Sequence, residues 1–175
     1  MVIPLSPALL VACACGRLSG RLPDPVIMCS PFMGPGPLSR PSPREVASIR
    51  FINSVGHWAL YDPITNISSW PFPRFPSVDA LASFGRRAEI LFDSPAYGDL
   101  VVVWSSAVNR FIRVAIVVRL LDVDGPEMRC LSLGAHSAGG RARLDEFVPA
   151  TGDRFVRWVL LDRRTLRGIP IAEAA

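Results

Sequence analysis

The sequence predicts an α+β domain in which N-terminal helices pack on a small antiparallel sheet. Two segments with helical spacing of apolar residues begin near Ser42 and Ser77, and runs rich in β-branched residues follow from Leu100 onward. The chain has 175 residues and 50% of them are hydrophobic, which suffices for one domain with a core of its own. Helices followed by strands, without alternation, favour the α+β class.

Residues 1–43 are predicted to be a disordered apolar leader and a proline-rich linker, residues 44–165 the domain, and residues 166–175 a tail. Val2 to Ala12 has the length of a signal-peptide core, and Leu10-Val11-Ala12-Cys13 is similar to the lipobox of bacterial lipoproteins. No basic residue precedes this run, so the localisation stays open between bacterial cytoplasm and export. The run is too short to span a bilayer, and no transmembrane segment is expected.

The linker, Leu22 to Pro43, contains seven prolines and two glycines. Proline fixes φ and removes a backbone donor, so neither a helix nor a central strand is expected there. We therefore expect residues before Ser42 to pack little against the rest of the chain.

Two helices are predicted in the first half of the domain. Ser42-Pro43-Arg44-Glu45 is a capping box with proline at the first helical position, and the helix is expected to continue to about Leu60. Ser77 is expected to cap a second helix from Val78 to about Ile90. The segment between them, Ile64 to Pro76, is predicted to be a loop whose aromatic side chains plug one end of the core. These aromatic residues are Trp70, Phe72 and Phe75.

The strands follow the second helix. Leu100 to Trp104 and Phe111 to Val118 are predicted to pair antiparallel, and Met128 to Leu133 and Phe155 to Leu161 are two further strands. Gly134 to Arg143 is predicted to be a glycine-rich connection. A period of two divides the second strand into two faces. One face is expected to hold Ile112, Val114, Ile116 and Val118, and the other Phe111, Arg113, Ala115 and Val117.

Arg113 is a charge on a face that is otherwise apolar. A buried unpaired charge is costly, so the guanidinium requires an acidic partner, water or the mouth of a cleft. Its planar set of donors suits a carboxylate, which makes Arg113 the candidate ligand-binding residue; the alternative is that Arg113 pairs with an acidic residue of its own chain and binds no ligand.

The stretch Gly98-Asp99-Leu100-Val101, followed by a strand with the core Arg113-Val114-Ala115-Ile116-Val117, resembles the CHAP amidohydrolase/peptidase family and its NlpC-like relatives. Phe51 to Leu60, which ends in Trp58-Ala59-Leu60, is similar to that family's helix motif. The resemblance implies a papain-like fold and a cysteine hydrolase of peptidoglycan. It also places the catalytic cysteine at Ile52 and the catalytic histidine at Arg113, which are expected to face each other across a shallow groove.

Neither Ile52 nor Arg113 can perform the family's chemistry, because a cysteine hydrolase needs a thiolate and a base. Arginine stays protonated at any working pH. The segment that matches the family's orienting residue, Leu133-Gly134-Ala135, also has no suitable side chain. The resemblance therefore implies a non-catalytic pseudoenzyme that binds a cell-wall peptide or a protein partner.

An alternative is an active hydrolase or acyltransferase of permuted type. His57-Trp58-Ala59-Leu60-Tyr61 resembles a motif of lecithin retinol acyltransferase-like proteins, in which histidine precedes cysteine. Under this hypothesis Cys130 is the nucleophile and His57 or His136 is the base.

Other classes of function are not favoured. The net charge is +4, but the basic residues are all arginine and are scattered, so nucleic-acid binding is not expected. The four cysteines have neither zinc-finger spacing nor the pattern of a disulfide framework. We expect no metal and no cofactor.

Overall fold

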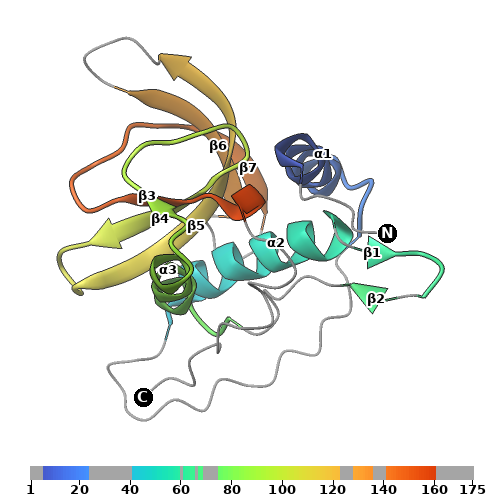
Figure 1. The fold of residues 1–175 in the computed structure, drawn as a ribbon, viewed down its shortest axis with the longest axis horizontal. Coiled ribbons are helices and arrows are strands. Elements are labelled where there is room, and N and C mark those ends of the chain that lie inside the picture. Colours follow the sequence, from blue (N-terminus) through green and yellow to red (C-terminus); the bar gives the residue numbers. More distant parts are fainter. Residues whose placement is uncertain are drawn as a thin grey trace.

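The computed structural model describes residues 6–23, 41–59, 61–65, 67–68, 75–122, 128–135 and 141–160. These residues form an α+β structure with three α-helices, a two-stranded sheet and a six-stranded antiparallel sheet (Figure 1). The predicted fold class is thereby confirmed at this level. The helices are α1 (Pro7–Leu18), α2 (Pro43–Ala59) and α3 (Val78–Arg87).

The strands and their order differ in part from the prediction. The small sheet contains β1 (Tyr61–Asp62) and β2 (Ile67–Ser68), and β2 lies in the segment predicted to be a loop. The large sheet has the order β3-β8-β4-β5-β6-β7, so β8 is inserted between β3 and β4. Its strands are β3 (Leu91–Phe92), β4 (Leu100–Ser105), β5 (Arg110–Asp122), β6 (Arg129–Ala135), β7 (Ala142–Phe147) and β8 (Arg154–Val156).

Local sequence signals explain where α2 and α3 begin. The Ser42 hydroxyl accepts a hydrogen bond from the backbone N–H of Glu45 at 3.2 Å, which confirms the first turn of the capping box. The Ser77 hydroxyl accepts one from the N–H of Ala80 at 3.1 Å. Helix α3 ends earlier than predicted, because the chain turns at Ala88 and Glu89, and Glu89 has a positive φ of 58°.

The central strands pair as predicted. β4 and β5 are antiparallel, with Leu100 opposite Ile116 and Val103 opposite Arg113. β5 also pairs antiparallel with β6, and β6 with β7. The glycine-rich segment is shorter than expected, because Gly134 and Ala135 belong to β6, and Ala142 and Arg143 to β7.

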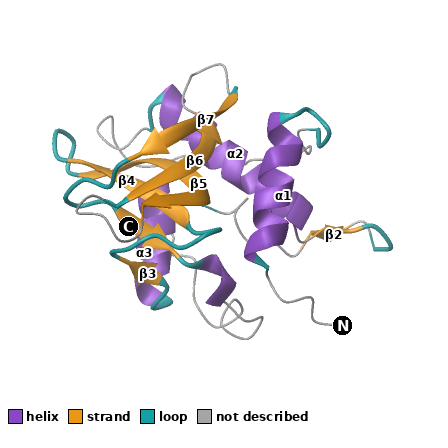
Figure 2. Cartoon of the chain, turned by 90° about the horizontal axis from the view of Figure 1, so that it is seen from above, coloured by secondary structure: helices purple, strands orange, loops and turns teal. Residues whose placement is uncertain are grey.

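The two faces of the sheet contact different sets of side chains. The helix-side core joins α1, α2 and α3 to one face, which includes Val102, Val114, Ile116 and Leu133. The opposite face carries a second, smaller set of buried residues, here called the outer cluster. The outer cluster consists of Val101, Ala115, Val117, Cys130, Phe147 and Phe155. Figure 2 shows α1 and α2 together on one side of the sheet.

A β-bulge places Phe111 on the other face of β5 from the one predicted. The register shifts between Val103 and Trp104, so Trp104 lies opposite Phe111 while Val103 lies opposite Arg113. The additional residue on β5 reverses the side-chain alternation at this point. Phe111 consequently belongs to the helix-side core, whereas the sequence places it on the same face as Arg113.

The predicted disordered leader is wrong for residues 7–18, which form α1. Leu10 and Ala14 are fully buried in the helix-side core. At Gly98, whose φ is 84°, an added Cβ would lie 2.6 Å from the Cβ of Pro7, so the start of α1 closely approaches the turn before β4. Residues 24–40, which contain most of the predicted linker, lie outside the described residues, as does the predicted tail.

Candidate functional site

The structure does not bring Ile52 and Arg113 together. Ile52 is fully buried in the helix-side core. Arg113 lies opposite Val103, which packs against the outer cluster, while the neighbouring pair Val102 and Val114 belongs to the helix-side core. Side chains of directly paired residues share a face, so the sheet separates Arg113 from Ile52. The prediction that Ile52 and Arg113 face each other across a groove is therefore wrong, and so is the alignment that places the CHAP family's catalytic pair at these two positions.

The start of α2 meets β5 at a different position, through Glu45 and Ser48. The Ser48 hydroxyl donates to the carbonyl oxygen of Glu45 at 2.9 Å and accepts from the N–H of Val114 at 3.3 Å. Both partners are backbone groups, and Ser48 is fully buried. Its hydroxyl thus links α2 to β5.

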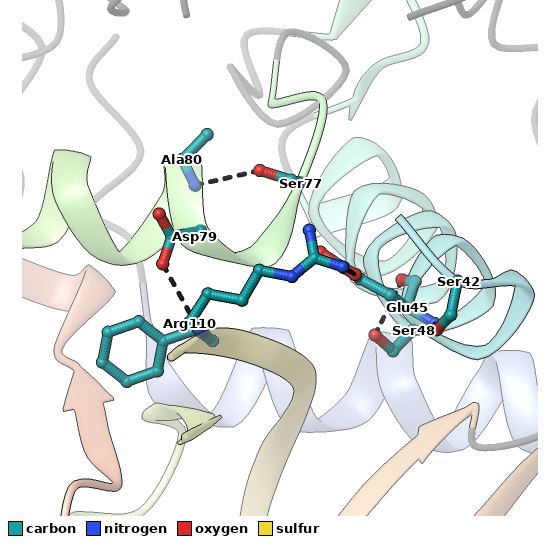
Figure 3. A network of polar contacts seen from close by, with 8 residues as sticks. Ser42, Glu45, Ser48, Ser77, Asp79, Ala80 and Arg110 are labelled. Carbon is teal, nitrogen blue, oxygen red and sulfur yellow. Dashed lines mark hydrogen bonds and ion pairs between the residues drawn. The ribbon is translucent and has the colours of Figure 1, made fainter. Parts of the chain in front are cut away.

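Glu45 and Arg110 form an ion pair at the same junction. One guanidinium nitrogen of Arg110 lies 3.1 Å from a carboxylate oxygen of Glu45, and the Glu45 side chain is completely inaccessible to solvent. Figure 3 shows Arg110 extending from β5 between the first turns of α2 and α3. Asp79, in the first turn of α3, accepts a hydrogen bond from the N–H of Phe111 at 3.2 Å. These contacts join three elements.

The electrostatics of Glu45 follow from its burial. Burial raises the pKa of the Glu45 carboxyl, because a charged carboxylate loses its hydration there. The Arg110 guanidinium and the backbone N–H groups of Ser42 and Val78 act in the opposite direction, and the nearby charge of Asp79 raises the pKa further. Neither carboxylate oxygen has a well-aligned hydrogen bond, so the 3.1 Å contact with Arg110 is best described as an ion pair.

Arg113 occupies the other face of the sheet, near acidic groups that already accept other hydrogen bonds. Asp153 accepts from the N–H groups of Trp104 and Ala150, and Asp145 pairs with Arg143 at 2.8 Å. Within the described residues Arg113 forms no ion pair, and its Nε is buried without a hydrogen-bond partner. Burial lowers the pKa of the Arg113 guanidinium, and the positive charge of Arg143 lowers it further. The carboxylates of Asp145 and Asp153 act in the opposite direction and raise it.

The permuted pair is also separated. Cys130 belongs to the outer cluster and is fully buried, and burial raises the pKa of its thiol to about 11. His57 lies in the last turn of α2, on the helix side, where its ring contacts Trp58 and Tyr61 at centroid distances of 5.1 and 5.5 Å. Burial lowers the pKa of His57. His136 lies outside the described residues.

Sequence reasoning missed the junction between α2 and β5. The capping box identifies Glu45 as the residue that closes the first turn, but nothing in the local pattern relates it to Arg110, 65 positions later. An acidic residue in a first turn and an arginine at a strand end are each common on protein surfaces. Only the packing of α2 across β5 makes them partners.

No metal site is evident in the described part of the chain, since no three His, Cys, Asp or Glu side chains cluster there. Within the same residues, none of the helices has the length and apolar character needed to cross a membrane. Comparisons with protein-family models, curated proteins and solved structures gave no match.

Proposed function

We propose that this chain is a non-catalytic binding domain, and that Arg113 binds a carboxylate of its ligand. The observation that carries the proposal is the separation of the candidate nucleophile from a candidate base. The thiol of Cys130 and the imidazole of His57 lie on opposite sides of the sheet. Cysteine hydrolysis requires a thiolate beside a base.

The junction between α2 and β5 supports the loss of catalysis. In a papain-like hydrolase a cysteine opens a helix, where the helix N-terminus stabilises the thiolate, and the catalytic histidine lies on a strand. In this chain the opening of α2 reaches β5 through Glu45 and Ser48 instead. Glu45 is neutralised by Arg110, and Ser48 is hydrogen-bonded to backbone groups. The opening of α2 therefore holds an ion pair and backbone hydrogen bonds, and its first six residues include no cysteine.

The state of Arg113 supports carboxylate binding. A guanidinium offers five donors in a rigid planar arrangement that matches a carboxylate in bidentate fashion. The neighbouring acids, Asp145 and Asp153, already accept hydrogen bonds from other groups, and Arg113 has no ion-pair partner within the described residues. Partial burial excludes competing water, so a carboxylate that reaches this guanidinium gains more than at an exposed arginine. Peptide termini and peptidoglycan stems carry such groups.

The alternative, a hydrolase that uses Cys130, is disfavoured by the environment of the thiol. With a pKa of about 11 the side chain is protonated at neutral pH, and a protonated thiol is a poor nucleophile. Its complete burial also prevents contact with a polymeric substrate. This argument holds for either histidine as base.

Turnover measurements test the absence of catalysis. The purified chain, under reducing conditions, is incubated with peptidoglycan and with soluble stem peptides, and released amines and fragments are quantified by mass spectrometry. We expect no product above that of a heat-denatured sample, with or without a thiol-alkylating reagent. Product formation that disappears in Cys130→Ala would overturn the proposal in favour of the permuted hydrolase.

Binding measurements test the role of Arg113. Stem peptides with free carboxylates and their fully amidated counterparts are titrated into the isotope-labelled chain and followed by NMR. Arg113→Met is compared with Arg119→Met, because Arg119 is an exposed arginine on the same strand. We expect binding of the free acids to weaken roughly tenfold in Arg113→Met, the effect of losing a charge-assisted hydrogen-bonded pair, and to persist in Arg119→Met. Equal affinity of all three proteins would exclude Arg113 as the binding residue.

A further inference from the structure

Among the described residues, β7 is the longer of the two edge strands of the six-stranded sheet. In the described residues it pairs with β6 on one side only, while the opposite edge of the sheet is formed by β3, which has just two residues. An unpaired edge presents backbone N–H and C=O groups that can accept a further strand. The exposed fraction of Leu144, in the middle of β7, is 48%, so a large apolar side chain faces solvent at this edge.

The charges of β7 are arranged symmetrically about Leu144. Arg143 precedes it and Asp145 follows it, and these two side chains form an ion pair of 2.8 Å on one face of the strand. When two copies of β7 run antiparallel with Leu144 opposite Leu144, Arg143 of each copy lies directly opposite Asp145 of the other. Cross-strand pairs of opposite charge, and paired apolar side chains, stabilise antiparallel sheets.

We propose that two copies of this chain associate through their β7 strands, in this register, to form one continuous antiparallel sheet. The twofold axis passes between the two Leu144 side chains, so each copy offers the same surface to the other, as in most homodimers. Leu144 lies across from Leu133 of the helix-side core, which places the two leucines on the face that carries the helices. Both sets of helices then cover the same side of the joined sheet.

Charged residues on an edge strand usually discourage the addition of another strand. In β7 these charges disfavour only some registers. The charges of Arg143 and Asp145 repel a second β7 strand that is shifted by two residues, and they attract one in the symmetric register. A shift by two residues in one direction places Asp145 opposite Asp145, and a shift in the other direction places Arg143 opposite Arg143. The charge pattern therefore specifies one register for self-association.

Charge reversal tests this register. In Arg143→Asp the two aspartates of one copy face two aspartates of the other, and in Asp145→Arg arginine faces arginine, so we expect each variant to be monomeric. An equimolar mixture of the two variants restores both opposite-charge pairs across the interface, and so does the double variant Arg143→Asp/Asp145→Arg. Sedimentation equilibrium over a range of concentrations measures the dimerisation constant of each protein and of the mixture.

The expected result is a dimer for the natural chain, at least a tenfold weaker constant for each single variant, and recovery in the mixture. Leu144→Asp is expected to be monomeric, whereas Val108→Asp is the matched control, because Val108 is 54% exposed in the turn between β4 and β5. Circular dichroism establishes that each variant is folded. A natural chain that stays monomeric at every concentration, or variants that remain monomeric when mixed, would overturn the proposal.

Discussion

Glu45 is a fully buried carboxylate whose ion pair in the described residues is with Arg110. A buried ion pair adds little net stability, but removal of one partner leaves a charge that is neither hydrated nor compensated. We therefore expect removal of one partner to lower the free energy of unfolding by much more than the intact pair contributes to it.

Arg110→Met tests this effect. We expect the free energy of unfolding at neutral pH to fall by about 3 kcal/mol, the typical cost of breaking a buried pair. Arg129→Met is the control, since Arg129 and Glu146 form an exposed pair at 3.0 Å, and its loss is expected to cost less than about 1 kcal/mol. Denaturant unfolding at fixed pH provides both values. Equal losses in the two variants would show that the Glu45–Arg110 contact is not a buried ion pair in solution.

The pH dependence of stability gives a second test at Glu45. Its pKa in the folded chain is raised, so the folded state binds a proton more tightly than the unfolded state. This group therefore contributes stability that is present below the unfolded pKa and is lost as the pH rises through the folded pKa.

Glu45→Gln removes this contribution, so between acidic and neutral pH the variant should gain stability relative to the natural chain. In Arg110→Met the pKa of Glu45 rises further, and the destabilisation should shrink as the pH falls. Unfolding curves recorded between pH 4 and pH 8 measure both differences. A difference between Glu45→Gln and the natural chain that is independent of pH would contradict the raised pKa.

At the level of single residues, contacts between neighbours in the sequence could be predicted, and contacts between distant segments could not. The Ser42 and Ser77 caps were predictable because a cap depends on neighbours within three positions. The side of the sheet on which Phe111 lies was not, because the bulge beside Val103 depends on the pairing of two strands. The ion pair of Glu45 and Arg110 depends on how α2 crosses β5, which no local pattern encodes.

Helix α1 is the element for which composition was misleading. Its apolar residues resemble a disordered leader because prolines precede and follow them, yet Leu10 and Ala14 complete the helix-side core. Trp58 of α2 donates a hydrogen bond from its ring N–H to the carbonyl oxygen of Pro23 at 2.9 Å, which fixes the segment after α1. A helix of 12 residues is marginal alone, so its stability depends on this packing.

Leu10→Ala tests whether α1 belongs to the folded domain. We expect a loss of about 3 kcal/mol in the free energy of unfolding, because the substitution leaves a cavity among buried side chains. Leu18→Ala, on the same helix but 45% exposed, is the control and should change stability by no more than about 0.5 kcal/mol. If both substitutions have the same small effect, α1 does not pack on the domain in solution.

The strands were predictable as elements and only in part as a sheet. Leu100–Ser105 and Arg110–Asp122 have the β-branched composition of buried strands. The first is predicted to within one residue, whereas the second continues to Asp122, beyond its predicted end at Val118. β7 was missed because its sequence, Ala-Arg-Leu-Asp-Glu-Phe, is half charged, as is common for an edge strand. The insertion of β8 between β3 and β4 is a long-range pairing without a local signature.

At the scale of the whole molecule, the sheet separates two sets of ionisable residues. His57 and Glu45 lie on the helix side, while Cys130 and Arg113 lie on the side of the outer cluster. The thiol of Cys130 should accordingly be inert in the folded chain. We expect iodoacetamide to alkylate the exposed Cys15 quickly and the buried Cys13 and Cys130 only after unfolding, as measured by peptide mass spectrometry. Rapid alkylation of Cys130 in the native chain would contradict its burial.

The separation of residues 52 and 113 by the sheet is tested most directly by introducing a cysteine and a histidine at these two positions. Ile52→Cys/Arg113→His supplies a thiol and an imidazole, and its turnover of peptidoglycan stem peptides is measured beside that of the natural chain, with circular dichroism to establish that the variant is folded. The account predicts no turnover by either protein, because the sheet lies between residues 52 and 113. Hydrolysis by the folded double variant that is abolished by alkylation would contradict it, since the two side chains would then have to meet on one side of the sheet.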